Sequence, residues 1–460
     1  MLEFYGKALK YFEMKKQKKL PKNFDLKTLT ISHVGSRGEG ISKLFTEFNY
    51  QEKSYNFFVP YTLPNELVIA KPKNLSSEGI GAQLIEIKKP SPERVNPECK
   101  HFFKCGGCLL QHWNLKSYKN WKMERISHPI SQISPEIEIK PIISSPIKSR
   151  RHAKFIAKKN KTNTIIGFNE YRRHYITEID KCIILDKKLI KLIIDIEEPI
   201  NELLEIGDTI YIHANLLDHG IDLLIDGLND TSYKNLIRFN ESIIKTNVVR
   251  LHRTRKDKTL DLLFVKEQAS LTNTLYSSII FPPPGSFLQA TQNGENTIIE
   301  NIIKALAKIN KRKFICELFA GCGTITFPLL SKGFKVKAYE IDVESVNAIN
   351  FASKKQGFVN KISAQSRNLK TYPLTSEELS KFDAIIIDPP RSGARDQFLN
   401  IAKSDVPIVI SISCNINTFI RDAWILIENN YILKWVQPID QFLFSPHIEI
   451  VCLFERNEAN

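Results

Sequence analysis

The segment Phe314-Ile-Cys-Glu-Leu-Phe-Ala-Gly-Cys-Gly-Thr324 decides the fold, because an apolar run passes directly into a glycine-rich turn. Glycine lets the backbone turn tightly and approach a ligand closely. From about Lys311 onward, apolar runs of strand length alternate with helix-length segments. The expected strands are Phe314–Phe319, Lys335–Ile341, Ile362–Ser366, Ala384–Ile387, Ile408–Ile412, Trp435–Ile439 and Ile448–Phe454. This order predicts an open, doubly wound α/β sheet, largely parallel, whose ligand lies beyond the carboxyl ends of the strands.

Three further parts precede this α/β domain, which we place at residues 286–460. Residues 1–26 are a basic extension rich in lysine, or the product of an upstream start codon with Met14 as the true start. Residues 27–88 alternate short apolar and polar segments separated by Gly, Pro and Asn, which predicts a small antiparallel barrel of the oligonucleotide-binding (OB) type. Residues 89–285 form a central domain with a Pro-rich linker, a cysteine cluster and basic strands such as Arg150–Lys159.

The composition is that of a globular protein with a polyanionic partner. At 460 residues the chain is too long for one core and suggests roughly three domains. Apolar residues make up 42%, and the longest apolar runs have strand length, so no membrane-spanning helix is expected. The formal charge of +15 favours nucleic acid, although a lysine-rich composition alone gives the same charge. Uneven cysteine spacing without a secretory signal indicates a reducing compartment, and we expect a cytoplasmic monomer that binds no membrane.

Residues at the strand ends point to a methyl-donor site. Glu340 ends the strand after the glycine loop, where a carboxylate can accept two ribose hydroxyl hydrogens; a solvated strand-end acid is the alternative. The Gly-x-Gly spacing lacks the third glycine of a dinucleotide fingerprint, and no basic group is placed for a pyrophosphate. S-adenosylmethionine, which has no pyrophosphate, therefore fits better than NAD. Asp388 is expected to face its methionine end, and Asn368 either recognises the adenine or forms a turn.

Cys414 and Glu449 are the predicted nucleophile and base. Arg391 follows Asp-Pro-Pro where an aromatic residue would indicate methylation of an exocyclic amine, and this favours reaction at carbon. Carbon 5 of uracil is a poor nucleophile until a thiolate adds to carbon 6, and Cys414 can supply that thiolate. Glu449 can then remove the proton from carbon 5. Taken singly, a cysteine at such a position is more often a small buried residue. The other cysteines of this domain are interpreted as packing residues: Cys316, Cys322 and Cys452.

A second group of cysteines lies in the central domain. Cys99, Cys105 and Cys108 are close in sequence, and Cys182 is the remaining cysteine of this region. Four thiolates could hold an iron–sulfur cluster, and the same four could hold a structural zinc ion. Spacing alone does not separate the two.

Taken together, these motifs resemble those of the bacterial RNA uracil-C5-methyltransferases. Within that family the chain is similar to the group that acts on 23S ribosomal RNA and carries an amino-terminal TRAM domain and a four-iron, four-sulfur cluster. The resemblance covers about residues 27–456. It rests on Cys99-x5-Cys105-Gly-Gly-Cys108-x2-Gln-His, Phe287-Leu-Gln289, Glu317-Leu-Phe-Ala-Gly-Cys-Gly-Thr324, Asp388-Pro-Pro-Arg-Ser-Gly, Ser413-Cys-Asn415 and His447-Ile-Glu449. The TRAM match at Ser36-Arg-Gly-Glu-Gly is shorter and looser.

The resemblance implies a Rossmann-like S-adenosylmethionine-dependent methyltransferase domain, a TRAM barrel of the OB type and a central α+β iron–sulfur domain. It assigns Cys414 as nucleophile and Glu449 as base. The donor contacts that it implies are Gln289, Phe319, Thr324, Glu340, Asn368 and Asp388. It also favours an iron–sulfur cluster over zinc at Cys99, Cys105, Cys108 and Cys182. Thr291 departs from the family pattern, since many relatives have Asn there, which leaves the role of that position open.

The predicted function is therefore methylation of carbon 5 of a uridine in 23S rRNA through a covalent cysteine–uracil intermediate. The target uridine must leave the base stack, because carbon 6 is not accessible within a helix. A tRNA 5-methyluridine methyltransferase is the nearest alternative, although such relatives lack the barrel and the cysteine cluster. A non-catalytic RNA-binding or ribosome-assembly protein on the same scaffold is the alternative from another class.

Overall fold

The computed structural model describes residues 18–19, 25–48, 51–228, 232–307, 309 and 313–457. Most of the basic extension predicted at residues 1–26, with Met14, lies outside these ranges. The chain forms two units: residues 1–125, 169–174 and 444–446 make up the first, and residues 126–168, 175–443 and 447–460 the second. No helix in the described ranges combines the length and apolar character needed to cross a lipid bilayer.

The first unit is built on a seven-stranded sheet of order β1-β6-β7-β5-β4-β3, with β2 also paired to β6. Its strands are β1 (Lys18–Lys19), β2 (Lys27–Thr30), β3 (His33–Val34), β4 (Glu39–Phe48), β5 (Gln51–Pro60), β6 (Leu67–Ser76) and β7 (Gly79–Lys89). All pairings are antiparallel except that of β5 with β7. The alternating apolar side chains pack on one side, with Phe57, Val59 and Val68 fully buried. Helix α2 (Leu115–Ile133) starts in this unit and ends in the second.

The second unit contains a seven-stranded sheet of order β12-β11-β10-β13-β14-β15-β16. Its elements are β10 (His152–Lys159), β11 (Thr164–Asn169), β12 (Ile176–Glu178), α3 (Lys187–Leu203), β13 (Thr209–Leu216), β14 (Ile221–Asp226), α4 (Tyr233–Ile243), β15 (Val248–Thr254) and β16 (Leu260–Val265). Along β10, Ala153, Phe155 and Ala157 are buried while Lys154 and Lys158 point to the opposite face. A short hairpin of β17 (Leu271–Asn273) and β18 (Ser278–Ile280) follows.

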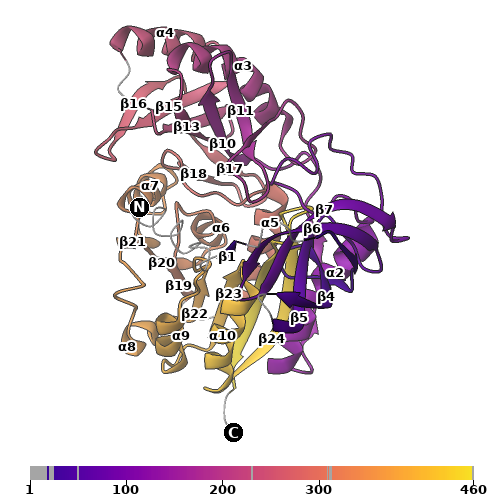
Figure 1. Ribbon diagram of the computed structural model, residues 1–460. Coiled ribbons are helices and arrows are strands. Elements are labelled where there is room, and N and C mark those ends of the chain that lie inside the picture. Colours follow the sequence, from indigo (N-terminus) through magenta and orange to yellow (C-terminus); the bar gives the residue numbers. More distant parts are fainter. Residues whose placement is uncertain are drawn as a thin grey trace. The chain divides into compact units, whose positions relative to one another are not determined.

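The nine-stranded sheet of the second unit confirms the predicted α/β architecture. Its order is β21-β20-β19-β22-β23-β25-β24-β8, with β9 also paired to β24. The strands are β8 (Glu138–Ile139), β9 (Ile143–Ser144), β19 (Phe314–Leu318), β20 (Lys335–Glu340), β21 (Ile362–Ser366), β22 (Ala384–Ile387), β23 (Ile408–Ser413), β24 (Tyr431–Asp440) and β25 (Glu449–Arg456). Strands β19 to β23 are parallel and lie side by side, and β25 is antiparallel to β23 (Figure 1).

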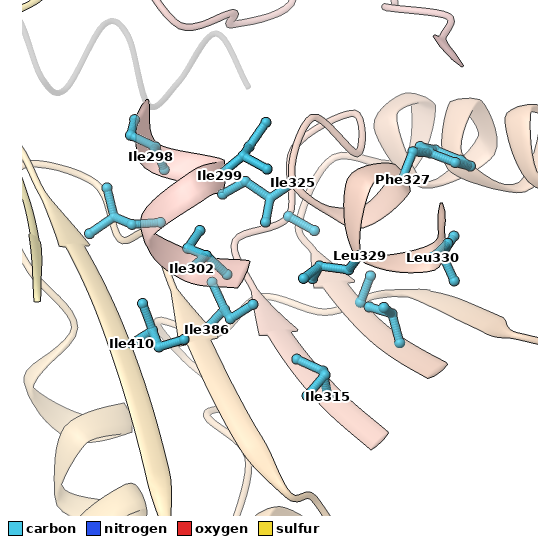
Figure 2. Packing of buried hydrophobic residues seen from close by; sticks show 14 of the residues in the cluster. Ile298, Ile299, Ile302, Ile315, Ile325, Phe327, Leu329, Leu330, Ile386 and Ile410 are labelled. Atoms are coloured by element: carbon cyan, nitrogen blue, oxygen red, sulfur yellow. The ribbon is translucent and has the colours of Figure 1, made fainter. Parts of the chain in front are cut away.

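Helices cover both faces of this sheet because its strands are apolar on both sides. The helices are α5 (Gln292–Leu306), α6 (Thr326–Ser331), α7 (Val343–Lys355), α8 (Ser376–Leu379), α9 (Arg395–Ala402) and α10 (Ile416–Ile427). On one face Ile298 and Ile302 of α5 pack with Phe327 of α6 against Ile315 and Ile410 of the strands (Figure 2). Side chains of α9 and α10 cover the other face. Full burial of one such side chain contributes roughly 1.5 to 3 kcal/mol, so the packed helices hold the strand ends in fixed positions.

Candidate active site

The glycine loop after β19 provides an open ledge at the carboxyl end of the sheet. Phe319 has a φ of 64° and Gly321 a φ of 55°, a region that side chains other than glycine rarely adopt. The loop is held by hydrogen bonds from the Ala320 amide to the Tyr339 carbonyl and from the Gly321 amide to Glu340. A Cβ atom added at Gly321 would meet nothing within 4 Å, so there is free space in front of the loop. Thr324 lies in the same loop, just before α6.

Glu340 ends β20 with its carboxylate fixed by backbone amides. Oε2 accepts from the Gly321 amide at 2.9 Å, and Oε1 accepts from the amides of Ile341 and Asp342 at 2.8 and 3.0 Å. Glu340 therefore lies against the glycine loop, and its carboxylate retains lone pairs for hydroxyl donors. Asn368, after β21, accepts from the Lys370 amide at 3.1 Å, which is the turn-forming role left open from the sequence.

Asp388 and Glu317 are two further carboxyl groups near Glu340. Asp388 follows β22, and burial raises its pKa to about 7. Glu317 on β19 accepts from Thr326 Oγ1 at 2.6 Å, and burial, with the nearby charges of Asp388 and Glu340, raises the pKa of Glu317 to about 8. Sequence reasoning missed Glu317, although an acid inside an apolar strand was a visible signal. The arrangement favours a cationic ligand, and the sulfonium and ammonium groups of S-adenosylmethionine meet that requirement.

The sheet brings Cys414 and Glu449 together. Cys414 directly follows β23, and Glu449 is the first residue of β25; Ser413 pairs with Ile450 across these two strands. Burial raises the pKa of the Cys414 thiol to about 12, and the charges of Glu449 and Asp388 act in the same direction. Arg391 opposes this shift by its charge and by a hydrogen bond to the sulfur. Burial, followed by the charge of Asp388, raises the pKa of Glu449 well above its usual value.

Gln289 is connected to Glu449 by Gln441, a residue that the sequence analysis did not identify. Gln441, just after β24, donates from its side-chain amide to Gln289 and to Glu449. Gln289 lies 152 positions away in the chain, so no local pattern announces the contact. Thr291 instead caps α5, since its Oγ1 accepts from the Gly294 amide at 3.0 Å and shares a hydrogen bond with Ser145 Oγ at 2.6 Å. The departure from Asn at this position thus retains a capping oxygen.

The four cysteines predicted to hold a cluster lie outside this group. Cys99, Cys105 and Cys108 belong to the first unit and Cys182 to the second. Within the described ranges, no three or more His, Cys, Asp or Glu side chains are arranged to hold a metal ion. The Cys182 sulfur accepts from the amides of Ile184 and Leu185 at 3.4 and 3.5 Å, and the Cys105 sulfur accepts from Gly107 at 3.4 Å. These amide contacts involve two of the four predicted ligands, Cys105 and Cys182.

Comparison with known proteins agrees with this geometry. The sequence model described as tRNA (Uracil-5-)-methyltransferase matches residues 226–457. An RNA methyltransferase of Caulobacter vibrioides is 33% identical over 438 residues, which cover 94% of this chain and all of that protein. The 23S rRNA (uracil(1939)-C(5))-methyltransferase of Acinetobacter baylyi is 27% identical over 455 residues, covering 93% of this chain and 96% of that protein.

A solved structure shares the fold. The tRNA (uracil-54, C5)-methyltransferase of Pyrococcus abyssi, in complex with S-adenosyl-L-homocysteine, superposes with a TM-score of 0.71. The two sequences are 19% identical, and the match covers 93% of this chain and 99% of that one. At this level of identity the likeness concerns the architecture alone.

Proposed function

Since the chain belongs to the tRNA (uracil-5-)-methyltransferase family of RNA methyltransferases, we propose that it methylates carbon 5 of a specific uridine in 23S rRNA. The observation that carries the proposal is the placement of Cys414 and Glu449 at the ends of neighbouring strands, beside Asp388 and Arg391. A soft nucleophile and a buried carboxylate at one strand-end site suit attack on a flat, electron-poor ring. The same pair has no evident use in a protein that only binds RNA.

The chemistry follows from the roles of these two side chains. The Cys414 sulfur adds to carbon 6 of the uracil, and the ring electrons pass to carbon 5 and the neighbouring carbonyl oxygen as an enolate. S-adenosylmethionine, when bound, would supply an electrophilic methyl group to carbon 5, and S-adenosylhomocysteine would leave with the electron pair of the broken sulfur–methyl bond. Glu449 then removes the proton from carbon 5, and the electrons of that bond expel the Cys414 sulfur and restore the ring double bond. No oxidant or metal is needed for the balance.

The donor is proposed to lie on the ledge in front of Gly321. Glu340 would accept hydrogen bonds from the ribose hydroxyls, while Asp388 and Glu317 would face the positively charged methionine end. Phe319, Thr324 and Gln289 complete the proposed donor contacts. Asn368 is the weakest of the set, because its side chain already closes a turn.

The choice of 23S rRNA over tRNA rests on the relatives. The 23S rRNA enzyme of Acinetobacter baylyi and the tRNA enzyme of Pyrococcus abyssi each cover 93% of this chain, but the first is 27% identical to it and the second 19%. Strand β10 offers Lys154 and Lys158 on one face, with the Lys154 ammonium 4.5 Å from the centre of the Tyr211 ring, a surface suited to phosphate and base contacts. We keep the TRAM interpretation of residues 27–88 as part of the proposal.

The iron–sulfur cluster stays a proposal that the cysteine pattern supports. Backbone amide donors toward Cys105 and Cys182 match the hydrogen bonding that tunes cluster sulfurs. A metal often organises its own ligands, and the site need not exist before the metal binds. The reaction proposed above uses none of these residues.

The test is methyl transfer from labelled S-adenosylmethionine to transcripts of 23S rRNA and of tRNA, followed by mass spectrometry of ribonuclease fragments. We expect 5-methyluridine in the 23S transcript and a stable protein–RNA adduct when the transcript contains 5-fluorouridine, since fluorine cannot leave as a proton. Labelling of tRNA alone would move the proposal to the tRNA enzyme. Absence of methylation and of adduct on both RNAs would favour a binding protein.

A further inference from the structure

Gln441 links the proposed donor site to the proposed base through one side chain. Its Nε2 donates to Oε1 of Gln289 at 2.8 Å and to Oε2 of Glu449 at 3.2 Å. Its Oε1 accepts from the backbone amide of Ala290 at 3.1 Å. The side chain is 2% exposed, so water does not compete for these three bonds. Every polar atom of the Gln441 amide therefore has a partner in the site.

The orientation of the Gln441 amide is fixed by chemistry. A backbone N–H can only donate, so the atom facing Ala290 must be the oxygen, and the amino group must face Gln289 and Glu449. Gln289 in turn presents its oxygen to Gln441, which directs its own amino group away from Gln441. A rotation of the Gln441 amide by half a turn would place its amino group against the N–H of Ala290 and its oxygen against two acceptors, losing all three bonds.

The surroundings of Gln441 hold it in this place. Gly294 lies in the first turn of α5, and a Cβ atom there would come within 2.9 Å of Gln441 Oε1 and 3.0 Å of its Cβ. The backbone of Gln289 is held from the other side, because Arg151 Nε donates to the Gln289 carbonyl at 3.1 Å. Arg151 is itself paired with buried Glu295 at 2.5 Å. The site thus has a shaped space for this glutamine.

We infer that Gln441 is a positioning residue that holds Glu449 and Gln289 in one hydrogen-bonded unit, so that the base is aimed while the donor is bound. The inference rests on the proposed function, since it gives Glu449 the proton-removing role. It predicts that Gln441 matters for the step after methyl transfer and little for the attack by Cys414.

The charges around Glu449 explain why the base needs this contact. Burial and the negative charge of Asp388 raise the pKa of Glu449, and Cys414 adds another like charge when it is ionised. The hydrogen bond from Gln441 and the charge of Arg391 act in the opposite direction. Without the Gln441 donor the pKa of Glu449 rises further, so a larger fraction is protonated at neutral pH and cannot accept a proton.

The experiment compares Gln441→Met with Gln437→Met. Gln437 is a matched control, because it lies on β24 shortly before Gln441, is also buried, and donates to the carbonyls of Pro141 and Pro438. Gln441→Met should form the adduct with 5-fluorouridine RNA at the wild-type rate when S-adenosylmethionine is saturating, because its link to the donor contact Gln289 is then not limiting. On normal RNA its release of methylated product should be roughly ten- to hundredfold slower, the scale of one hydrogen bond to a charged group. Methylated RNA should accumulate attached to Cys414.

The pH profile separates this role from a packing defect. Release should rise with pH as Glu449 loses its proton, and the midpoint of this rise should move to higher pH in Gln441→Met. Gln437→Met should leave the midpoint unchanged even if it lowers thermal stability. Equal release rates and midpoints for the two variants would overturn the inference.

Two further variants test the positioning role of Gln441 if Gln441→Met does not fold. Gln441→Glu retains the shape but replaces the donor by an acid, and should slow release more than Gln441→Met does. Gly294→Ala should displace the Gln441 side chain and reproduce the slow release in milder form. Normal release in both would refute the inference, whereas failure of the wild-type protein to methylate any transcript would refute the proposed function instead.

Discussion

The strand-end site of the second unit and the cysteine group of the first were both predicted from sequence, and the structure treats them differently. Cys414 and Glu449 meet because β23 and β25 pair in a fixed register, and a sheet covered by helices on both faces cannot easily shift it. Cys99, Cys105 and Cys108 lie in segments without regular strand pairing, and they form no metal site with other described residues. Residues on paired strands are positioned by the fold, whereas loop cysteines depend on the ligand that they bind.

The largest expected effect comes from removing the nucleophile of the strand-end site. Cys414→Ala should abolish methyl transfer and adduct formation with 5-fluorouridine RNA, because no other described thiol adjoins Glu449 in the sheet register. Cys452→Ala is the matched control, since Cys452 is a fully buried cysteine on β25. The control should retain activity and show only lower thermal stability. Residual adduct in Cys414→Ala, seen on a denaturing gel, would contradict the proposed role of Cys414 as nucleophile.

Arg391 should have the next largest effect, on the attack step. It is the group that lowers the pKa of Cys414 against burial, so Arg391→Leu should raise that pKa further and reduce the thiolate fraction at neutral pH. Adduct formation should slow by roughly tenfold for each unit by which the pKa of Cys414 rises, and it should recover as the pH is raised. Rapid-quench adduct formation across the pH range measures this. Arg395→Leu removes an exposed charge four positions away and should leave the profile unchanged.

Glu340 tests whether the ledge holds the donor. Glu340→Ala should weaken S-adenosylmethionine binding by roughly 1 to 3 kcal/mol, the scale for losing hydrogen bonds to a charged group. Isothermal titration of the RNA-free protein measures the change directly. Glu344→Ala removes an exposed acid in the first turn of α7 and serves as control. Equal donor affinity in the two variants would remove Glu340 from the donor site.

The smallest effect on catalysis is expected from the four cysteines proposed to hold a cluster, three in the first unit and Cys182 in the second. Anaerobically purified protein should contain about four irons per chain with broad absorbance near 400 nm, and Cys182→Ser should lose both. Methyl transfer by Cys182→Ser should fall mainly through reduced stability, because Cys414 and Glu449 do not depend on iron. Colourless wild-type protein holding one zinc ion would contradict the cluster proposal and leave the strand-end site intact.

Sequence reasoning predicted strand bounds correctly where the local pattern of residues defines the strand. Strands β21 and β22 have the predicted bounds, and β19 and β20 differ by one residue at one end, since their apolar runs end at polar or glycine-rich turns. Strand β24 begins four residues before the predicted Trp435. Lys434 interrupts the apolar pattern there, and the pairing with β25 is irregular between Leu433 and Trp435.

The parts that sequence reasoning missed depend on contacts between distant segments. Gln441 looks like an ordinary polar residue after a strand, and its role appears only when Gln289 and Glu449 are seen on either side of its amide. Glu317 carried a weak signal as an acid within an apolar strand, but its raised pKa requires the burial that only the folded sheet provides. Likewise, the spacing of the four cysteines along the sequence does not indicate that they belong to two different units.

The raised pKa of Cys414 favours the protonated thiol in the free protein, which bears on its proposed role as nucleophile. Peroxide and alkylating reagents react with thiolates, so a buried thiol with a pKa near 12 is protected from oxidation and from premature capture by small electrophiles. In the proposed reaction, the positive charge of a bound donor would offset the charges of Glu449 and Asp388, which together with burial raise this pKa. Iodoacetamide should accordingly label Cys414 slowly in the free protein and faster when a non-reacting cationic donor analogue is bound. In the proposed reaction, the Cys414 thiol would therefore stay protonated and unreactive until the donor is bound.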